Sequence, residues 1–454
     1  MQVFKSIFPY TQETIATYPV MNIHQIDIAK KNATEAFSSW RQKSFSERAE
    51  VLNRASGILL KNKNEYAKLI THEMGKIISE SIGEIEKCAL VCKYYAEHAE
   101  TFLVNENLQS KFYKSYVEYE PIGAVFGIMP WNFPFWQVFR FAAPTLMAGN
   151  VIFLKHAPNV FGSAIAIEKI FEEAGAGKGV FQSLIIDVPE IENIVSSTIV
   201  QAVTLTGSGK AGSSFASLAG KQIKKSVLEL GGSDALIVLK DADIAEAAKI
   251  AIQSRMQNAG QSCIASKRFI VEKNVHDDFV HEIFTRITSL KQGDPFDENI
   301  SMGPMARTDL AVKLEQQMND SIKKGAVLKT GGQRNDSNFI PGLLLNIKKD
   351  MPASCEELFG PLAVVISAKD ADDAITIAND SEYGLGASIW TSDLEKGMKY
   401  AKKIQAGSVF INSLVKSDPA MPFGGIKKSG YGRELGKWGI HEFVNAKTVV
   451  VNNT

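Results

Sequence analysis

The chain has 454 residues, which at about 150 residues per domain suggests roughly three folding units. Its 50 basic residues balance 50 acidic ones, and 45% of its residues are hydrophobic while 22% are charged. This composition is typical of a globular protein, and it argues against a disordered chain or a nucleic-acid-binding protein that depends on net positive charge.

The N-terminal segment, MQVFKSIFPYTQETIATYPV, has no continuous apolar run followed by a small-residue cleavage site, so we expect no secretory signal. Between residues 25 and 72, apolar residues such as Val51, Ala55 and Leu59 recur at helical spacing among lysines and glutamates. We therefore expect about the first hundred residues to be mostly helical.

One segment, Pro121–Phe139, contains no charged residue and is long enough in principle to cross a bilayer. Pro121, Pro130 and Pro134 would interrupt a helix there, and the segment also contains polar side chains. We interpret it as a buried, loop-rich segment, and we expect no membrane association.

Further along the chain, short apolar runs alternate with longer amphipathic ones, which predicts a mostly parallel, doubly wound sheet. The first series comprises strands at 151–154, 202–206 and 235–239, with helices at 164–173, 211–219 and 244–257. The second comprises strands at 268–272, 362–367, 387–390 and 408–412, with helices at 275–290, 307–324, 371–379 and 394–405. Two α/β domains account for both series.

Two segments, Lys111–Glu120 and Lys447–Val451, fit neither series. The first alternates charged with aromatic or aliphatic residues, and the second is rich in β-branched residues, so both favour strands. They could pair as a protruding sheet that docks on another subunit, or they could be two ordinary edge strands.

A glycine-rich segment, Thr206–Gly212, follows a predicted strand and has the spacing G-x-G-x-x-G. Glycines at this place let backbone amides at a helix N-terminus approach a phosphate. A dinucleotide fingerprint also has an acidic residue about twenty positions later, and Glu229 lies near that distance. The alternative is a tight strand-to-helix turn without a ligand.

The chain has four cysteines, which are too few for a disulfide framework and favour a reducing, intracellular compartment. Cys263 lies among small and polar residues just after a predicted helix, where we expect backbone dipoles to lower its pKa and make it a nucleophile. The alternative is a structural cysteine. Cys88 and Cys92 lie one helical turn apart, and the histidines show no ligand spacing with the cysteines, so we expect no metal site.

Asn132 is bracketed by two prolines and two aromatic residues in Met129–Pro134. Such a rigid, water-excluding setting could hold a side-chain amide for donation to a developing oxyanion, or it could simply be a hydrogen-bonded turn. Glu229 has apolar neighbours that would raise its pKa and suit a general base, or it could form an ion pair with Lys225.

Taken together and in order, these motifs resemble the aldehyde dehydrogenase superfamily. The resemblance extends through nearly the whole chain, in the segments Pro130–Pro134, Lys155, Leu205–Ser208, Leu228–Gly232, Gly260–Cys263, Glu357–Pro361 and Pro422–Gly425. It implies two doubly wound α/β domains with a small oligomerisation sheet. The implied division is residues 1–102 and 122–230 for the dinucleotide-binding domain, 231–430 for the catalytic domain, and 103–121 with 431–454 for the oligomerisation strands.

The resemblance also implies the catalytic roles. Cys263 matches the nucleophile, Asn132 the oxyanion donor and Glu229 the general base. Attack of the thiolate on an aldehyde would give a thiohemiacetal, loss of hydride to the nicotinamide would give a thioester, and water activated by Glu229 would release the acid. Two alternatives belong to other functional classes. The chain could be a catalytically silent protein with the same fold, or it could be a thiol hydrolase that uses no cofactor.

For the cofactor, the resemblance places Lys155 and Glu357 at ribose hydroxyls, Gly207 and Ser208 at the pyrophosphate, and Trp131 and Phe359 at the nicotinamide end. Many NAD-preferring members have a glutamate three residues after the lysine, where this chain has Pro158. Proline cannot repel a 2′-phosphate and His156 could approach one, so both NAD and NADP are admissible.

For the substrate, Arg140 and Ser417 match positions that bind the distal carboxylate in succinate-semialdehyde dehydrogenases. A second arginine common in those enzymes is here Gln257, although Lys416 could supply charge. An arginine in the apolar helix Phe135–Met147 needs an anionic partner, and an internal ion pair is the alternative to a substrate.

Succinate semialdehyde is the expected substrate, with another small semialdehyde or an aliphatic aldehyde as alternative. The resemblance also implies a cytoplasmic homodimer or homotetramer, without nucleic acid or membrane partners. The sequence does not separate these two oligomeric states.

Overall fold

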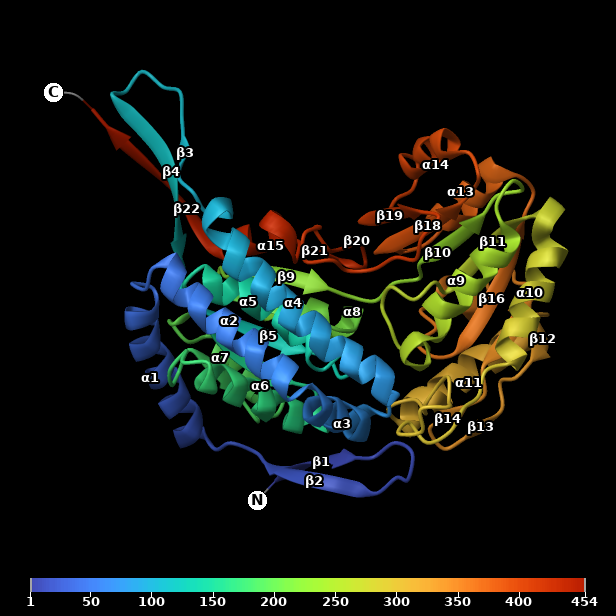
Figure 1. The fold of residues 1–454 in the computed structure, drawn as a ribbon, viewed down its shortest axis with the longest axis horizontal. Coiled ribbons are helices and arrows are strands. Elements are labelled where there is room, and N and C mark those ends of the chain that lie inside the picture. Colours follow the sequence, from blue (N-terminus) through green and yellow to red (C-terminus); the bar gives the residue numbers. More distant parts are fainter. Residues whose placement is uncertain (1, 453–454) are drawn as a thin grey trace.

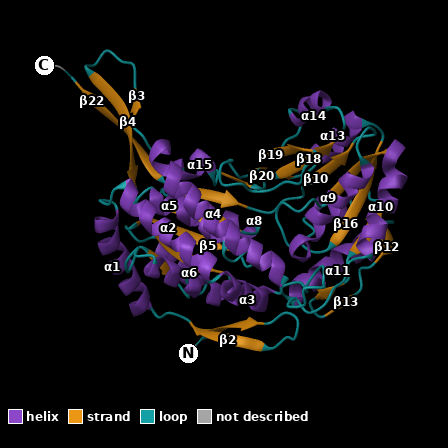
Figure 2. Ribbon diagram, viewed as in Figure 1, coloured by secondary structure: helices purple, strands orange, loops and turns teal. Residues whose placement is uncertain are grey.

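A computed structural model describes residues 2–452. Figure 1 shows two parallel sheets flanked by helices and a narrow three-stranded sheet that projects at one end. Figure 2 shows that helices cover the strands of both parallel sheets. The chain is therefore a mixed α/β protein with the two doubly wound sheets that the alternation of strands and helices predicts.

The first parallel sheet has the strand order β21-β9-β8-β5-β6-β7, and only β21 is antiparallel to its neighbour. Its strands are β5 (Ala124–Met129), β6 (Val151–His156), β7 (Phe181–Ser183), β8 (Val200–Thr206), β9 (Lys225–Glu229) and β21 (Gly430–Tyr431). The helices between them are α5 (Trp136–Met147), α6 (Phe161–Glu173), α7 (Glu190–Val195) and α8 (Gly209–Lys221), with the 3₁₀ turn η1 (Pro158–Val160). All residues of β6 are buried, as expected for a strand covered on both faces.

Four N-terminal helices surround this sheet: α1 (Ile23–Trp40), α2 (Phe45–Lys61), α3 (Lys63–Met74) and α4 (Ile78–Phe102). Helix α1 contacts β6, whereas α2, α3 and α4 pack on the covering helices α5 and α6. Capping boxes begin α1 at Asn22 and α2 at Ser44. Helix α4 packs against α2 and α5, which brings its buried face to the site described below.

The second parallel sheet has the order β12-β15-β16-β11-β10-β18-β19, and only the edge pair β12 and β15 is antiparallel. Its strands are β10 (Ala235–Val238), β11 (Arg268–Glu272), β12 (Val327–Thr330), β15 (Gly342–Leu345), β16 (Leu362–Ala368), β18 (Gly386–Trp390) and β19 (Ser408–Ile411). Its helices are α9 (Ile244–Met256), α10 (His276–Thr288), α11 (Thr308–Lys323), α12 (Pro352–Cys355), α13 (Ala371–Asn379) and α14 (Leu394–Ala401), with the 3₁₀ turns η2 (Gln257–Gly260) and η3 (Lys273–Val275).

The two peripheral strands pair with each other, as one of the two sequence-based alternatives predicts. Strand β4 (Lys114–Pro121) runs antiparallel to β22 (Val444–Val451), and β3 (Glu106–Asn107) flanks β4. Together they form the projecting sheet in Figure 1.

The remaining short elements are β13 (Arg334–Asn335), β14 (Asn338–Phe339), β17 (Tyr383–Gly384), β20 (Ile426–Lys427) and α15 (Gly436–His441). The domain boundaries stay a prediction.

The N-terminal region contains a hairpin that the helical pattern did not predict. Strands β1 (Val3–Ile7) and β2 (Thr14–Pro19) pair with each other ahead of α1. The Ser6 hydroxyl is buried and donates to the Asn159 carbonyl at 2.7 Å. The hairpin is thus fixed by a contact far along the chain, which local periodicity cannot reveal.

The uncharged segment Pro121–Phe139 is buried as expected, but it is less loop-rich than expected, because it forms β5 and the first turn of α5. Only the turn between them, which contains Pro130 and Pro134, is irregular. Among residues 2–452, no helix combines the length and the apolar character that a membrane span needs.

Candidate active site

Two cavities meet at Cys263. One, the Ser208 cavity, has a volume of about 200 Å³ and is lined by Ser208, Glu229 and Asn132 as well as Cys263. The other, the Lys87 cavity, has a volume of about 310 Å³ and is lined by Lys87, Arg140, Gln257, Ser417 and Cys263, among others. A thiol shared by two cavities could react with a molecule in one while a second molecule occupies the other.

The loop that presents Cys263 has an unusual backbone. Helix α9 ends at Met256, and Asn258 and Ala259 then adopt left-handed conformations with φ of 54° and 51°. Such conformations cost about 1–2 kcal/mol per residue outside glycine. The Asn258 amide donates to Glu80 Oε2 at 2.9 Å, and the buried Lys267 ammonium donates to the carbonyls of Ser262 and Cys263. These contacts stabilise the loop.

The predicted lowering of the Cys263 pKa is wrong for the unliganded protein. Burial raises the pKa of this half-buried thiol to about 11, although the positive charges of Arg140 and Lys267 oppose the rise. The preceding helix presents its C-terminal end, whose partial charge is negative and does not stabilise a thiolate. Desolvation therefore dominates, and the thiol needs a base when it reacts.

Asn132 lies in the turn after β5 and is 3% exposed. Its Nδ2 donates to the Gln261 carbonyl at 3.0 Å, and its own carbonyl accepts from Asn258 Nδ2 at 2.7 Å. These two bonds join the asparagine turn to the cysteine loop. The Asn132 side chain is consequently fixed on the wall of the Ser208 cavity, beside Cys263.

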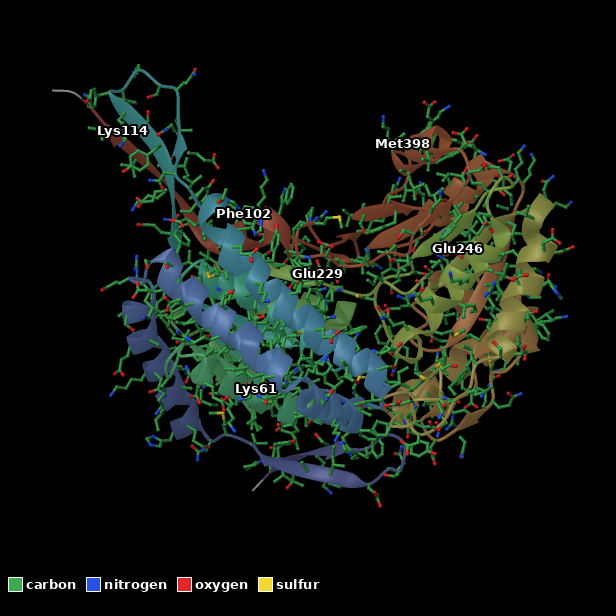
Figure 3. The ribbon with its side chains drawn as sticks, in the orientation of Figure 1. Lys61, Phe102, Lys114, Glu229, Glu246 and Met398 are labelled. Atoms are coloured by element: carbon green, nitrogen blue, oxygen red, sulfur yellow. The ribbon has the colours of Figure 1, made fainter. Side chains whose placement is uncertain are left out.

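Glu229 is the last residue of β9, and Figure 3 labels it at the end of this strand. Its side chain is buried, and neither carboxylate oxygen has a hydrogen-bond partner among the described residues. Burial, reinforced by the charge of Glu434, raises its pKa well above the ordinary value. The alternative pairing with Lys225 is wrong, because Lys225 binds Glu442 at 2.7 Å. A carboxyl without a partner and with a raised pKa suits proton transfer.

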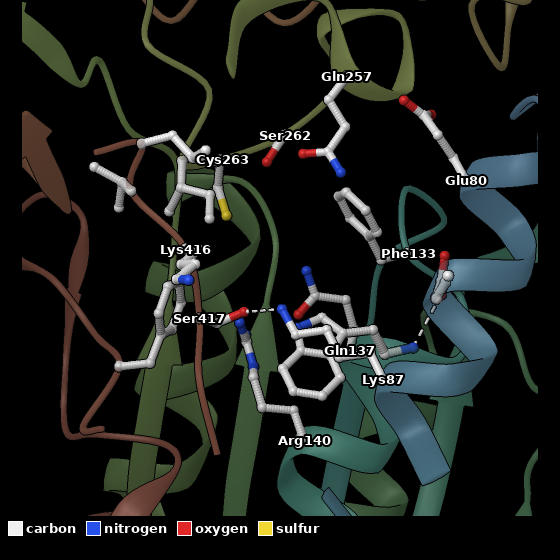
Figure 4. A pocket seen from close by; sticks show the side chains of 17 residues that line it. Glu80, Lys87, Phe133, Gln137, Arg140, Gln257, Ser262, Cys263, Lys416 and Ser417 are labelled. Carbon is white, nitrogen blue, oxygen red and sulfur yellow. Dashed lines mark hydrogen bonds between the residues drawn. The ribbon is translucent and has the colours of Figure 1, made fainter. Parts of the chain in front are cut away.

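Arg140 has the internal ion pair that we considered as an alternative. Its Nε contacts Glu434 Oε2, its guanidinium lies 4.6 Å from the Phe423 ring centroid, and Nη2 donates to Thr206 Oγ1 at 3.3 Å. It nevertheless lines the Lys87 cavity with Gln257 and Ser417 (Figure 4). Arg140 can therefore contact a molecule in this cavity, but its charge is largely compensated.

Five of the predicted cofactor residues line the Ser208 cavity together, namely Trp131, Gly207, Ser208, Glu357 and Phe359. The rings of Trp131 and Phe359 meet edge to face at 5.8 Å, and Ser208 caps the N-terminus of α8 through Ala211 N. A Cβ at Gly231 would contact the Glu357 carboxylate, which accepts from the Gly232 amide at 2.9 Å. Gly207 and Ser208 line the cavity at the N-terminus of α8. A helix N-terminus can bind the phosphates of a dinucleotide through its free backbone amides.

The other two predicted cofactor residues lie outside the lining of this cavity. Lys155 is buried near the end of β6, next to Ile128 of β5, and forms no ion pair within residues 2–452. Pro158 begins η1. Their predicted contacts with a ribose stay a prediction.

The suggestion that His156 approaches a phosphate is wrong. Its ring is fully buried, Nδ1 accepts from the Ala157 amide at 3.0 Å, and Nε2 donates to the Pro134 carbonyl at 2.8 Å. Burial lowers its pKa to about 4, so the ring is neutral near pH 7. Both faces of β6 are covered, so the His156 ring lies in the core.

Sequence reasoning missed four charged residues that the fold brings to the site: Glu80, Lys87, Lys267 and Glu434. Glu80 and Lys87 line the Lys87 cavity from α4, while Lys267 and Glu434 contact Cys263 and Arg140 respectively. Each is buried or half-buried, and a charged residue in a long amphipathic helix or near a strand gives no local signal of burial. Only their tertiary partners identify them.

The geometry places one cysteine, Cys263, where the Ser208 cavity and the Lys87 cavity meet. A family model, the aldehyde dehydrogenase family, matches residues 1–449, and the chain belongs to this family. It is 47% identical over 447 residues to a probable succinate-semialdehyde dehydrogenase [NADP(+)] of Synechocystis sp., and 98% of each chain is covered.

Two further relatives are also named as succinate semialdehyde dehydrogenases. The chain is 42% identical to succinate semialdehyde dehydrogenase [NAD(P)+] Sad of Escherichia coli, over 98% of this chain and 97% of that one. Among solved structures, succinic semialdehyde dehydrogenase of Streptococcus pyogenes, in complex with NADP+, superposes with a TM-score of 0.97 at 36% identity. That comparison covers 99% of this chain and 100% of the other, so the predicted fold and enzyme class are confirmed.

Proposed function

We propose that the protein oxidises succinate semialdehyde to succinate and uses NADP+ or NAD+ as oxidant. The observation that carries this proposal is the position of Cys263 between the Ser208 cavity, which adjoins the N-terminus of α8, and the Lys87 cavity, which is lined by basic side chains. A short semialdehyde carries an aldehyde to react with the thiol and a carboxylate for the basic side chains. The named functions of the relatives support the same substrate.

In this proposal, Cys263 attacks the aldehyde carbon and its proton passes to a base. Water in the cavity accepts that proton and releases it to solvent, so Glu229, which faces the same cavity, stays available to activate water in the later step. The Asn132 amide would donate to the oxyanion of the thiohemiacetal, which its fixed position makes possible without reorganisation.

NAD(P)+, when bound in the Ser208 cavity, supplies the acceptor for the hydride that leaves the substrate carbon. Trp131 and Phe359 would border its reactive ring, Ser208 and Gly207 its phosphates, and Glu357 a ribose. Glu229 then takes a proton from water, the resulting hydroxide attacks the thioester on Cys263, and succinate leaves with the thiol restored.

Both cofactors are admitted in this proposal. Pro158 carries no charge that would repel a 2′-phosphate. Lys155, three residues earlier at the end of β6, provides a buried cation. The two relatives named above are named for NADP(+) and for NAD(P)+.

Steady-state kinetics on succinate semialdehyde and butyraldehyde, each with NADP+ and NAD+, test the proposal. The two aldehydes have the same chain length and differ in the carboxylate. We expect kcat/KM for succinate semialdehyde to exceed that for butyraldehyde by at least about 100-fold, because a site built for a charged group loses most of its affinity without it. Equal values for the two aldehydes would contradict the substrate assignment.

We also propose that the chain forms a homodimer or homotetramer in the cytoplasm. Strand β22 lies at an edge of the projecting sheet and exposes Val450 and Val451, which a second copy could cover. Light scattering on the purified protein tests this, and a monomeric mass at micromolar concentration would contradict it.

A further inference from the structure

Lys87 has a position that the family resemblance did not predict. It lies on α4, and its Nζ donates to Ser417 Oγ at 2.8 Å, from the opposite side of the Lys87 cavity (Figure 4). Nζ also lies 4.1 Å from the ring centroid of Trp136, on α5. Two segments of the chain far apart in sequence therefore meet at this ammonium group.

The other charged groups around Lys87 are compensated or exposed. Arg140 is paired with Glu434, and Glu84 is paired with Lys76 and accepts the backbone amides of Phe135 and Trp136. Glu80 accepts from the Asn258 amide. Lys416 lines the same cavity but is an exposed residue.

Lys87 itself forms no ion pair with any residue in the range 2–452, although it is half-buried. Burial lowers its pKa to about 8, and the nearby Arg140 charge acts in the same direction, whereas Asp418 and Glu84 oppose the shift. A cation that is partly desolvated and has no carboxylate partner is expected to bind an anion that enters the cavity.

Ser417 strengthens this arrangement. Its oxygen accepts the hydrogen bond from Lys87, which leaves its own O–H free to donate to a second acceptor in the cavity. The ammonium and the hydroxyl can thus donate to the two oxygens of one carboxylate. Gln257, which lines the same cavity, offers no charge.

We propose that Lys87, together with Ser417, binds the distal carboxylate of the semialdehyde and determines the preference for an acidic substrate. This inference rests on the proposed function and assigns the main charge contact to Lys87 rather than to the compensated Arg140. Trp136 holds the ammonium by a cation–π contact, so the charge is positioned before the substrate arrives.

The test compares wild type, Lys87→Met and Lys87→Arg on succinate semialdehyde and butyraldehyde. Lys87→Met keeps the length of the side chain and removes its charge. We expect it to lower kcat/KM for succinate semialdehyde about 10- to 100-fold, mainly through KM, and to leave the value for butyraldehyde within about threefold. Lys87→Arg should recover most of the loss. Lys93→Met, an exposed lysine on the same helix, is the matched control.

The outcomes separate the two proposals. An equal loss on both aldehydes in Lys87→Met would assign Lys87 a structural role only, and no loss on either would remove it from the site. A larger selective loss in Lys416→Met than in Lys87→Met would transfer the role to Lys416. If wild type itself does not prefer succinate semialdehyde, the proposed function fails, whatever the variants show.

Discussion

At the scale of single residues, the thiol of Cys263 is the most informative group. Burial raises its pKa to about 11, while the neighbouring cations Arg140 and Lys267 act against burial. The thiol is therefore protonated near pH 7 in the unliganded enzyme, and its reactivity must be created when the substrate and a base are in place.

This pKa predicts the alkylation behaviour of the free enzyme. Because only the thiolate reacts, the rate of Cys263 modification by iodoacetamide should rise about tenfold per pH unit from pH 7 toward 10. Peptide mass spectrometry separates Cys263 from the exposed Cys355, and Cys263→Ala provides the control. A rate that is already constant above about pH 8 would show an activated thiolate instead.

The residue types of the site were predictable, but their electrostatic states were not. Cys263, Asn132 and Glu229 were identified from their motifs, and the fold places all three around one cavity. The direction of the Cys263 pKa shift depends on burial by distant segments, and Glu434 and Lys87 act through partners on other elements. A linear sequence contains no local signal of such partners.

At the scale of elements, the turn between α9 and Cys263 determines where the thiol lies. Gly260 has φ of 71°, and a Cβ there would contact the carbonyl oxygen of Gly360. The glycine is thus required both by its left-handed backbone and by the close approach of another loop.

Gly260→Ala should therefore destabilise the protein and misplace Cys263. We expect a lower midpoint of thermal unfolding and a loss of activity larger than the fraction of protein unfolded at the assay temperature, because the strain acts on the cysteine loop itself. Gly57→Ala, in the middle of α2 with nothing within 4 Å of a new Cβ, should stabilise by up to about 1 kcal/mol. Equal behaviour of the two variants would contradict this interpretation of the turn.

Elements with a strong local pattern were the ones predicted well. The helices α11 and α13 and the strands β6, β8, β11 and β16 were predicted with bounds that differ from the observed ones by only a few residues. The parallel strands β5, β7, β9 and β15 were not predicted, and the strand predicted at 235–239 in the first series is β10 of the second sheet. The hairpin β1–β2 and the two-residue strands such as β17 and β20 form because distant segments approach them. Periodicity could not predict these elements.

At the scale of the whole molecule, the two parallel sheets supply different walls of one reaction site. The first sheet contributes Glu229 and the turns that contain Asn132 and Ser208. The second sheet contributes Cys263 from the loop before β11 and Glu357 from the loop before β16. The N-terminal helix α4 closes the other side with Lys87. The reaction chamber exists only when all three regions are assembled.

The central claim is that the substrate carbon becomes bonded to Cys263 and that Glu229 is needed to release it. Glu229→Gln should accumulate the thioester, because removal of a general base slows hydrolysis by about 100- to 10,000-fold. Mass spectrometry of this variant, quenched in acid after mixing with succinate semialdehyde and NADP+, measures the intermediate directly. We predict one succinyl group per chain, located on Cys263. An unmodified chain, or a succinyl group on Cys88, Cys92 or Cys355, would contradict the account.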